Sequence, residues 1–140
     1  GVGSYKAAAE RAGGDVSVAF IRKWARVHDL PQAIRRHVAR GTIAPTAAKH
    51  IARVAGDDRY ALAWATLEHG LTVREIRRLA SQVSDGRTVE AALADRELTF
   101  GHMGVTLPPA QYIELRRRAS IENRDPDELV TEALDDFLDP

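Results

Sequence analysis

The sequence predicts a mainly α-helical protein, with a helix-turn-helix inside a multi-helix bundle and a C-terminal strand-helix-helix dimerisation module. Three observations carry this prediction. Apolar residues recur at helical spacing up to about residue 97. Glycine and proline interrupt the pattern at short intervals, which is typical of helices joined by tight turns. From residue 102 onward the pattern alternates with period two, which is typical of a short half-buried strand.

The boundaries of the first seven helices follow from this punctuation. Proline suits the first turn of a helix, where its missing N–H has no partner, and glycine suits the end, where the backbone turns left-handed. Thr72 followed by Glu75 is a capping box and marks one helix start strongly. The predicted helices cover about 4–12, 17–28, 31–41, 45–55, 58–68, 73–83 and 89–97.

Two more helices follow the period-two segment. After Pro108-Pro109 the apolar residues return to helical spacing, and Asn123 can end that helix in a left-handed conformation. Asp125-Pro126 is a strong start signal for the last helix, with aspartate as the cap and proline in the first turn. We divide the chain into a DNA-binding domain (1–84), a linker helix (85–99) and a dimerisation module (100–140).

Charge is unevenly distributed along the chain. The 20 basic and 20 acidic residues cancel overall, but residues 1–56 carry a net charge of +7, residues 57–103 of −2 and residues 104–140 of −5. A basic region can meet a polyanion such as DNA, whereas an acidic region is repelled by one. The alternative is a dipolar surface that has no partner.

The helices on either side of Gly13-Gly14 form a helix-turn-helix candidate. The second helix of such a motif lies in the major groove, where arginine can pair with guanine and lysine or arginine can contact phosphate. The residues expected to meet DNA from this helix are Ser17, Arg22, Lys23 and Arg26. The alternative is an ordinary helical hairpin with a solvated basic face.

A series of short motifs runs through the same region. They are Leu30-Pro31, Gly41-Thr42-Ile43, Ala47-Ala48-Lys49-His50-Ile51, Gly70-Leu71 and Thr72-Val73-Arg74-Glu75-Ile76. In order and spacing, residues 4–83 resemble the central DNA-binding domain of the ParB/KorB family.

This resemblance implies a recognition helix and neighbouring basic helices that grip a DNA site. The matching positions are Ser17, Arg22 and Lys23, with Arg26 and Lys49 as backbone contacts. Val18 and Phe20 stand where the family usually has polar or basic residues. The family's nucleotide-binding domain has no counterpart in these 140 residues, so we expect no cofactor.

The period-two segment needs a partner because a lone strand leaves its backbone groups unpaired. We expect the same strand of a second copy, paired about a twofold axis. Strand, helix and helix in about forty residues resemble the ribbon-helix-helix (Arc/MetJ) fold. The dimerisation residues expected from it are Met103, Val105, Leu107, Leu115, Leu129, Leu134 and Phe137. Two alternatives stay open: residues 102–107 are an extended linker, or Arg116–Arg118 line a phosphate path.

Catalytic and metal sites are not predicted. The chain has no cysteine, and its five histidines are scattered without ligand spacing. It has no nucleophile elbow and no Gly-rich phosphate loop, so we expect no catalytic residue and no enzyme activity. With no signal peptide and no apolar run long enough for a membrane span, we expect a cytoplasmic, nucleoid-associated protein. The chain does not begin with methionine, so we interpret it as a fragment.

The sequence therefore predicts a homodimeric, sequence-specific double-stranded DNA-binding protein. An inverted-repeat site would match its twofold symmetry. The expected process is plasmid or chromosome partition, or transcription regulation. The alternative is a protein–protein adaptor, antitoxin-like or a segregation partner, that uses the acidic C-terminal helix to bind another protein.

Overall fold

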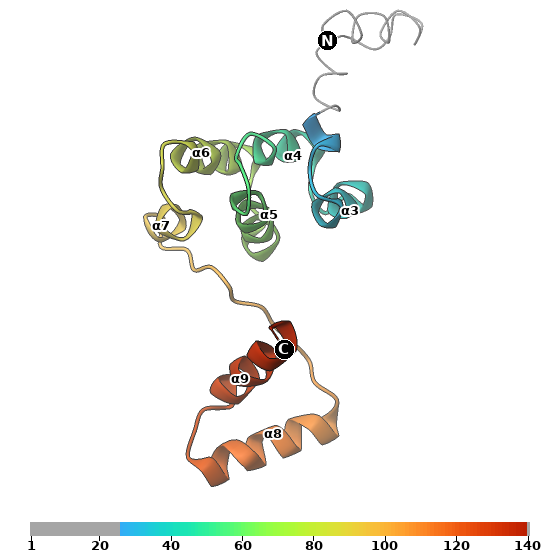
Figure 1. The fold of residues 1–140 in the computed structure, drawn as a ribbon, viewed down its shortest axis with the longest axis vertical. Coiled ribbons are helices and arrows are strands. Elements are labelled where there is room, and N and C mark those ends of the chain that lie inside the picture. The colour runs from blue at the N-terminus through green and yellow to red at the C-terminus, as the bar shows by residue number, and fades with distance from the viewer. Residues whose placement is uncertain (1–25, 140) are drawn as a thin grey trace, which may run out of the picture. The chain divides into compact units, whose positions relative to one another are not determined.

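A computed structural model describes residues 26–139 and shows helices joined by turns and loops (Figure 1). The chain divides between Met103 and Gly104 into two units. We call the described residues before this point the N-terminal unit and those after it the C-terminal unit. The N-terminal unit contains α3 (Gln32–Arg40), α4 (Pro45–Ile51), α5 (Asp58–His69), α6 (Val73–Ser84) and α7 (Val89–Ala94). The C-terminal unit contains α8 (Pro109–Glu122) and α9 (Pro126–Leu138).

The ends of α3, α5 and α6 confirm the predicted punctuation. Gly41 and Gly70 follow α3 and α5 with φ of 81° and 60°, a left-handed backbone that glycine adopts without strain. The capping box before α6 is formed as predicted. The Thr72 hydroxyl accepts from the Glu75 N–H at 3.2 Å, and the Glu75 carboxylate accepts from the Thr72 N–H at 3.0 Å.

Two helices are shorter than predicted. α4 ends at Ile51, four residues before the predicted end. The guanidinium of Arg59 donates to the carbonyls of Ala52 and Val54 at 2.9 and 2.7 Å, which satisfies them outside a helix. α7 ends at Ala94, and the predicted linker helix packs against α5 and α6 within the N-terminal unit.

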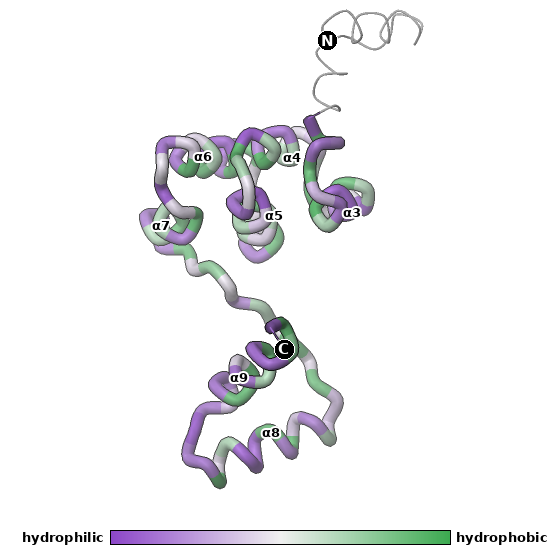
Figure 2. Tube along the Cα trace, viewed as in Figure 1, coloured by the Kyte–Doolittle hydropathy of each residue, from purple (hydrophilic) through white to green (hydrophobic). Residues whose placement is uncertain are grey.

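The N-terminal unit encloses one hydrophobic core. Its centre lies where α4 packs on α6, with α5 and α7 alongside. Hydrophobic and hydrophilic residues alternate along these helices in Figure 2, as expected when a helix buries one face. The largest side chains that are fully buried are Ile34, Ile43, Ile51, Leu62, Ile76, Leu79, Val89 and Leu93. This set draws on every helix of the unit, so the core ties all five together.

The predicted strand is wrong. Residues 102–107 are extended, but they form no β-ladder, and the part of the chain that the structure describes contains no strand to pair with them. Met103 and Val105 are 77% and 66% exposed, and Leu107 is half-buried. The alternation of small and apolar residues is therefore a property of an extended connection between the units. The predicted strand-helix-helix module is replaced by a helical hairpin.

The hairpin of α8 and α9 turns at the predicted place. Asn123 ends α8 in a left-handed conformation with φ of 53°, and Pro126 opens α9. Asp125 occupies the cap position of α9, but its side chain makes no capping hydrogen bond. Among the described residues of this unit, Ala119 is the one that is buried. The hairpin therefore contains the two predicted helices but buries almost none of their side chains.

A candidate nucleic-acid interface

The outer stripe of α6 is basic. Arg74, Arg77 and Arg78 are exposed, while Ile76 and Leu79 on the same helix are fully buried. The spacing i, i+3, i+4 places the three guanidinium groups on one side of the helix, opposite the core. The core packing of α6 therefore determines where these charges lie.

A second basic stripe lies on α4, the helix that packs most extensively on α6. Lys49 is half-buried on α4, and Arg53 is exposed in the turn just after it. Pro45 starts the helix, and Ala48 and Ile51 bury its inner face. Because α4 and α6 share an interface, their cations belong to neighbouring parts of one rigid unit.

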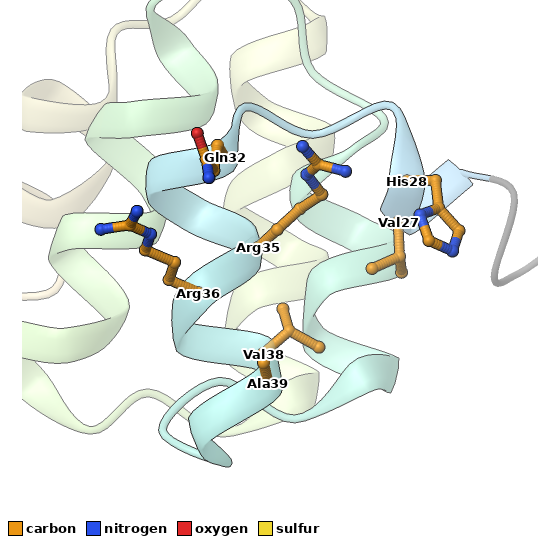
Figure 3. Close-up of a pocket in the computed structure, with 7 residues that line it drawn as sticks. All are labelled: Val27, His28, Gln32, Arg35, Arg36, Val38 and Ala39. Carbon is orange, nitrogen blue, oxygen red and sulfur yellow. The ribbon is translucent and has the colours of Figure 1, made fainter.

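The third basic element is α3, which carries exposed Arg35, Arg36 and Arg40. Arg35 and Arg36 line an open pocket of about 460 Å³ together with Val27 and His28 from the preceding turn. In Figure 3, Arg35 extends toward that turn, and Arg36 leaves α3 on the other side. The surface that lines the pocket is mostly apolar.

Within residues 26–139, these eight cations on or next to α3, α4 and α6 have no acidic partner. No ion pair or hydrogen bond involves any of their side chains within residues 26–139. The described ion pairs of the N-terminal unit lie elsewhere: Arg87 with Asp95, Arg96 with Glu75 at 3.5 Å, and His69 with Glu68 at 3.4 Å. We call the eight residues the unpaired cations: Arg35, Arg36, Arg40, Lys49, Arg53, Arg74, Arg77 and Arg78.

The residues expected from sequence to contact DNA are placed only in part. Ser17, Arg22 and Lys23 lie outside the described residues. Arg26 is exposed in the first described turn, and Lys49 belongs to the unpaired cations. The structure adds three arginines of α6 that the sequence reasoning missed, because they were counted with the acidic residues of the segment 57–103. The signal that could have found them is the Thr-Val-Arg-Glu helix start, which predicts Arg74, Arg77 and Arg78 on one face.

The end of α5 holds the last residues of the N-terminal unit. The Glu68 carboxylate accepts from the Gly101 N–H at 2.8 Å and from the Thr99 hydroxyl at 3.3 Å, while a His69 ring nitrogen bonds the Thr99 carbonyl. The hydrogen bond from Gly101 is the main cause that lowers the pKa of Glu68 below its ordinary value. This anchor fixes the point at which the chain leaves the unit.

The cations of the C-terminal unit are in the opposite situation. Arg117 and Arg118 bond the Glu114 carboxylate at 2.6 and 3.0 Å and lower its pKa to about 2. Arg124 reaches Glu128 and Glu132 at 3.3 and 2.7 Å. Most of these arginines are therefore already neutralised by neighbouring carboxylates, which disfavours a phosphate path along Arg116–Arg118.

The residues expected at the dimer interface are described throughout. Leu115 and Leu129 are half-buried and line a groove of about 690 Å³ between α8 and α9. Leu134 and Phe137 are 48% and 77% exposed. Met103, Val105 and Leu107 lie in the extended connection. The structure thus brings Leu115 and Leu129 together and leaves most of the others uncovered.

Comparison with known proteins gives one match, to DUF7119, a family of unknown function, over residues 1–98. The chain belongs to the DUF7119 family. The DUF7119 match includes all five helices of the N-terminal unit and ends before the C-terminal hairpin. No curated protein and no solved structure matches the chain. The unpaired cations therefore lie within the DUF7119 region, and the acidic hairpin lies outside it.

The described part of this DUF7119 protein has neither a metal-ligand cluster nor a membrane-spanning helix. Over residues 26–139, no three His, Asp or Glu side chains are grouped so that they could hold a metal ion. No helix in the same range is long and apolar enough to cross a bilayer. The unpaired cations on and next to α3, α4 and α6 are therefore the candidate site.

Proposed function

We propose that this chain is a site-specific double-stranded DNA-binding protein that acts on the nucleoid, in partition or in transcription regulation. The observation that supports the proposal best is the set of eight unpaired cations on a folded unit. Cations already paired with carboxylates have little to offer a polyanion, whereas unpaired ones can replace the counterions of DNA phosphates. The ParB/KorB-like motif series of residues 4–83 supports the same function.

Two groups of residues divide the work in this proposal. Ser17, Arg22 and Lys23 belong to the candidate recognition helix and read base edges in the major groove. Arg26, Lys49 and the remaining unpaired cations contact phosphates and set the register of the protein on the duplex. A second copy bound to the other half of an inverted repeat completes the site.

The proposal is tested by titrating labelled duplex DNA with the full chain and following fluorescence anisotropy between low and moderate salt. We expect the affinity to fall steeply with salt concentration. The double variant R77A/R78A removes two phosphate contacts, so the slope of log K against log salt should become shallower by about 2. Selection of bound duplexes from a random pool then reports the site and its symmetry.

The matched control is R117A/R118A, which removes the same two charges from the ion-paired hairpin. It should leave the salt slope unchanged. Absence of binding to any duplex at low salt would refute the proposed function. An equal loss of slope in both double variants would show that net charge, and not the surface of α6, governs binding.

A further inference from the structure

Large apolar side chains are exposed almost entirely at the C-terminal end of the described chain. Of the ten such side chains exposed among residues 26–139, nine lie from Met103 onward. The tenth, Leu67 on α5, is only 37% exposed. Apolar exposure concentrated in one part of the chain favours an interaction surface over the single apolar residues scattered on an ordinary protein surface.

Four of these side chains form a stripe on α9. Val130, Leu134, Phe137 and Leu138 are 40%, 48%, 77% and 72% exposed, and their spacing i, i+4, i+7, i+8 places them on one side of the helix. We call them the α9 stripe. Leu129, which faces the groove shared with α8, is not part of it. The stripe is therefore apolar surface that the hairpin itself does not cover.

The hairpin needs a cover because it cannot be stable alone. The two helices have 14 and 13 residues, close to the length at which isolated helices are marginal in water. Units of fewer than about 40 residues usually need a disulfide, a metal or oligomerisation. The chain has no cysteine, and the described residues group no metal ligands. Association with another molecule is the remaining route.

The exposed apolar area fits a symmetric partner of the same size. Seven of the nine lie on α8 and α9. A side chain of this kind offers roughly 60–120 Å² when fully exposed, so at their exposed fractions the seven offer roughly 250–500 Å² of apolar area from one copy. A specific, stable interface takes about 600–1,000 Å² from each partner. Because roughly 60% of such an interface is apolar, two hairpins that cover each other reach the lower part of that range.

A second copy also offers partners for charged groups that the hairpin leaves unpaired. Arg116 contacts Tyr112, whose hydroxyl accepts from it at 2.8 Å, and has no carboxylate partner among residues 26–139. On α9, Asp127, Asp135 and Asp136 form no ion pair within the same range. A twofold axis can place each hairpin's Arg116 against an aspartate of the other, which offsets part of the repulsion between two units of net charge −5.

We propose that the C-terminal unit is a helical homodimerisation module in which the α9 stripe packs against a second copy of this chain. The interface is built from the exposed apolar faces of α8 and α9, which include Tyr112 and Ile113. The proposal does not depend on DNA binding, because it concerns the oligomeric state of the protein alone.

The test is sedimentation equilibrium of the full chain, without DNA, at concentrations around 10 µM. We expect about twice the chain mass of 15.4 kDa. Leu134→Glu places a charge in the stripe and should raise the dimer dissociation constant at least about 30-fold. Gln111→Glu adds the same charge at the groove between the helices and should leave the constant nearly unchanged.

Cross-linking guards against a variant that simply fails to fold. Because the chain has no cysteine, an introduced cysteine is its one thiol. Leu138→Cys should be joined to a second copy by a short bis-maleimide, whereas Gln111→Cys should not. A monomeric wild-type chain, or a Leu134→Glu variant that dimerises as tightly as wild type, would overturn the proposal. So would a monomer that retains a different protein from a nuclease-treated lysate, which would make this surface an adaptor.

Discussion

The two units differ in the kind of side chain that they leave without a partner. The N-terminal unit buries its large apolar side chains, and its eight unpaired cations have no partner within residues 26–139. The C-terminal unit pairs three of its four arginines with carboxylates and leaves its large apolar side chains in contact with water. In each unit the groups left unsatisfied indicate the kind of partner that it fits: a polyanion for the first and an apolar surface for the second.

The largest effect that tests this contrast concerns the core. Leu62 is fully buried on α5, and Leu67 on the same helix is 37% exposed. Leu62→Ala should lower the free energy of unfolding by about 2–5 kcal/mol, because it removes buried contacts and leaves a cavity. Leu67→Ala should cost far less. Urea unfolding of the full chain measures both, and equal costs would contradict a core centred on α4, α5 and α6.

A smaller effect separates the helix starts of the two units. Thr72→Ala removes the capping box of α6 and should cost about 1 kcal/mol in urea unfolding. Asp125→Ala should cost only a few tenths, because its side chain makes no capping hydrogen bond and acts only through the helix dipole. Thr72→Ser keeps the hydroxyl and serves as the control. A loss at Asp125 as large as that at Thr72 would contradict this difference.

The smallest effect is a difference in pH dependence. Backbone N–H groups lower the pKa of Glu68 and Glu75, whereas arginines lower the pKa of Glu114 to about 2. A lowered folded-state pKa means that the folded state binds fewer protons than the unfolded state. The resulting stabilisation is complete above the ordinary value of 4.5 and is lost as the pH falls toward the folded-state value.

Salt distinguishes the two causes. Screening weakens the exposed pairs of Arg117 and Arg118 with Glu114 more than the capping hydrogen bond of Glu75. Thermal melts between pH 5 and 2 should therefore show a Glu114 contribution that shrinks at high salt and a Glu75 contribution that persists. The variants Glu114→Gln and Glu75→Gln show how much of the pH dependence of stability each carboxylate contributes. A Glu75 contribution that vanished in salt would show that Arg96, and not the cap, sets its pKa.

Local signals predicted most of the described helix boundaries. Gly41, Gly70, Asn123 and the Thr72 capping box act through their own backbone or near neighbours, so the sequence contains the whole cause of each. α4 ended earlier than predicted because Arg59, which lies seven residues beyond Ala52, takes up the carbonyls at its end. A pattern of apolar residues cannot show a side chain that folds back in this way.

The predicted strand failed for a related reason. Period two indicates which side chains can share a face, but a strand also needs a ladder, and residues 102–107 have none within the described chain. The candidate site was predicted incompletely because charge was summed along the sequence. Folding packs α6 on α4 and so brings Arg74, Arg77 and Arg78 next to the basic helices, although the segment that contains them is acidic overall.

The bond from Gly101 to Glu68 holds the chain just before the extended residues 102–107. Six residues span at most about 20 Å when fully extended. In a dimer held by the hairpins, the length of this segment limits the distance between each basic unit and the hairpin that follows it. One turn of duplex DNA advances about 34 Å. For the DNA binding proposed above, this limit predicts closely spaced half-sites rather than half-sites many helical turns apart.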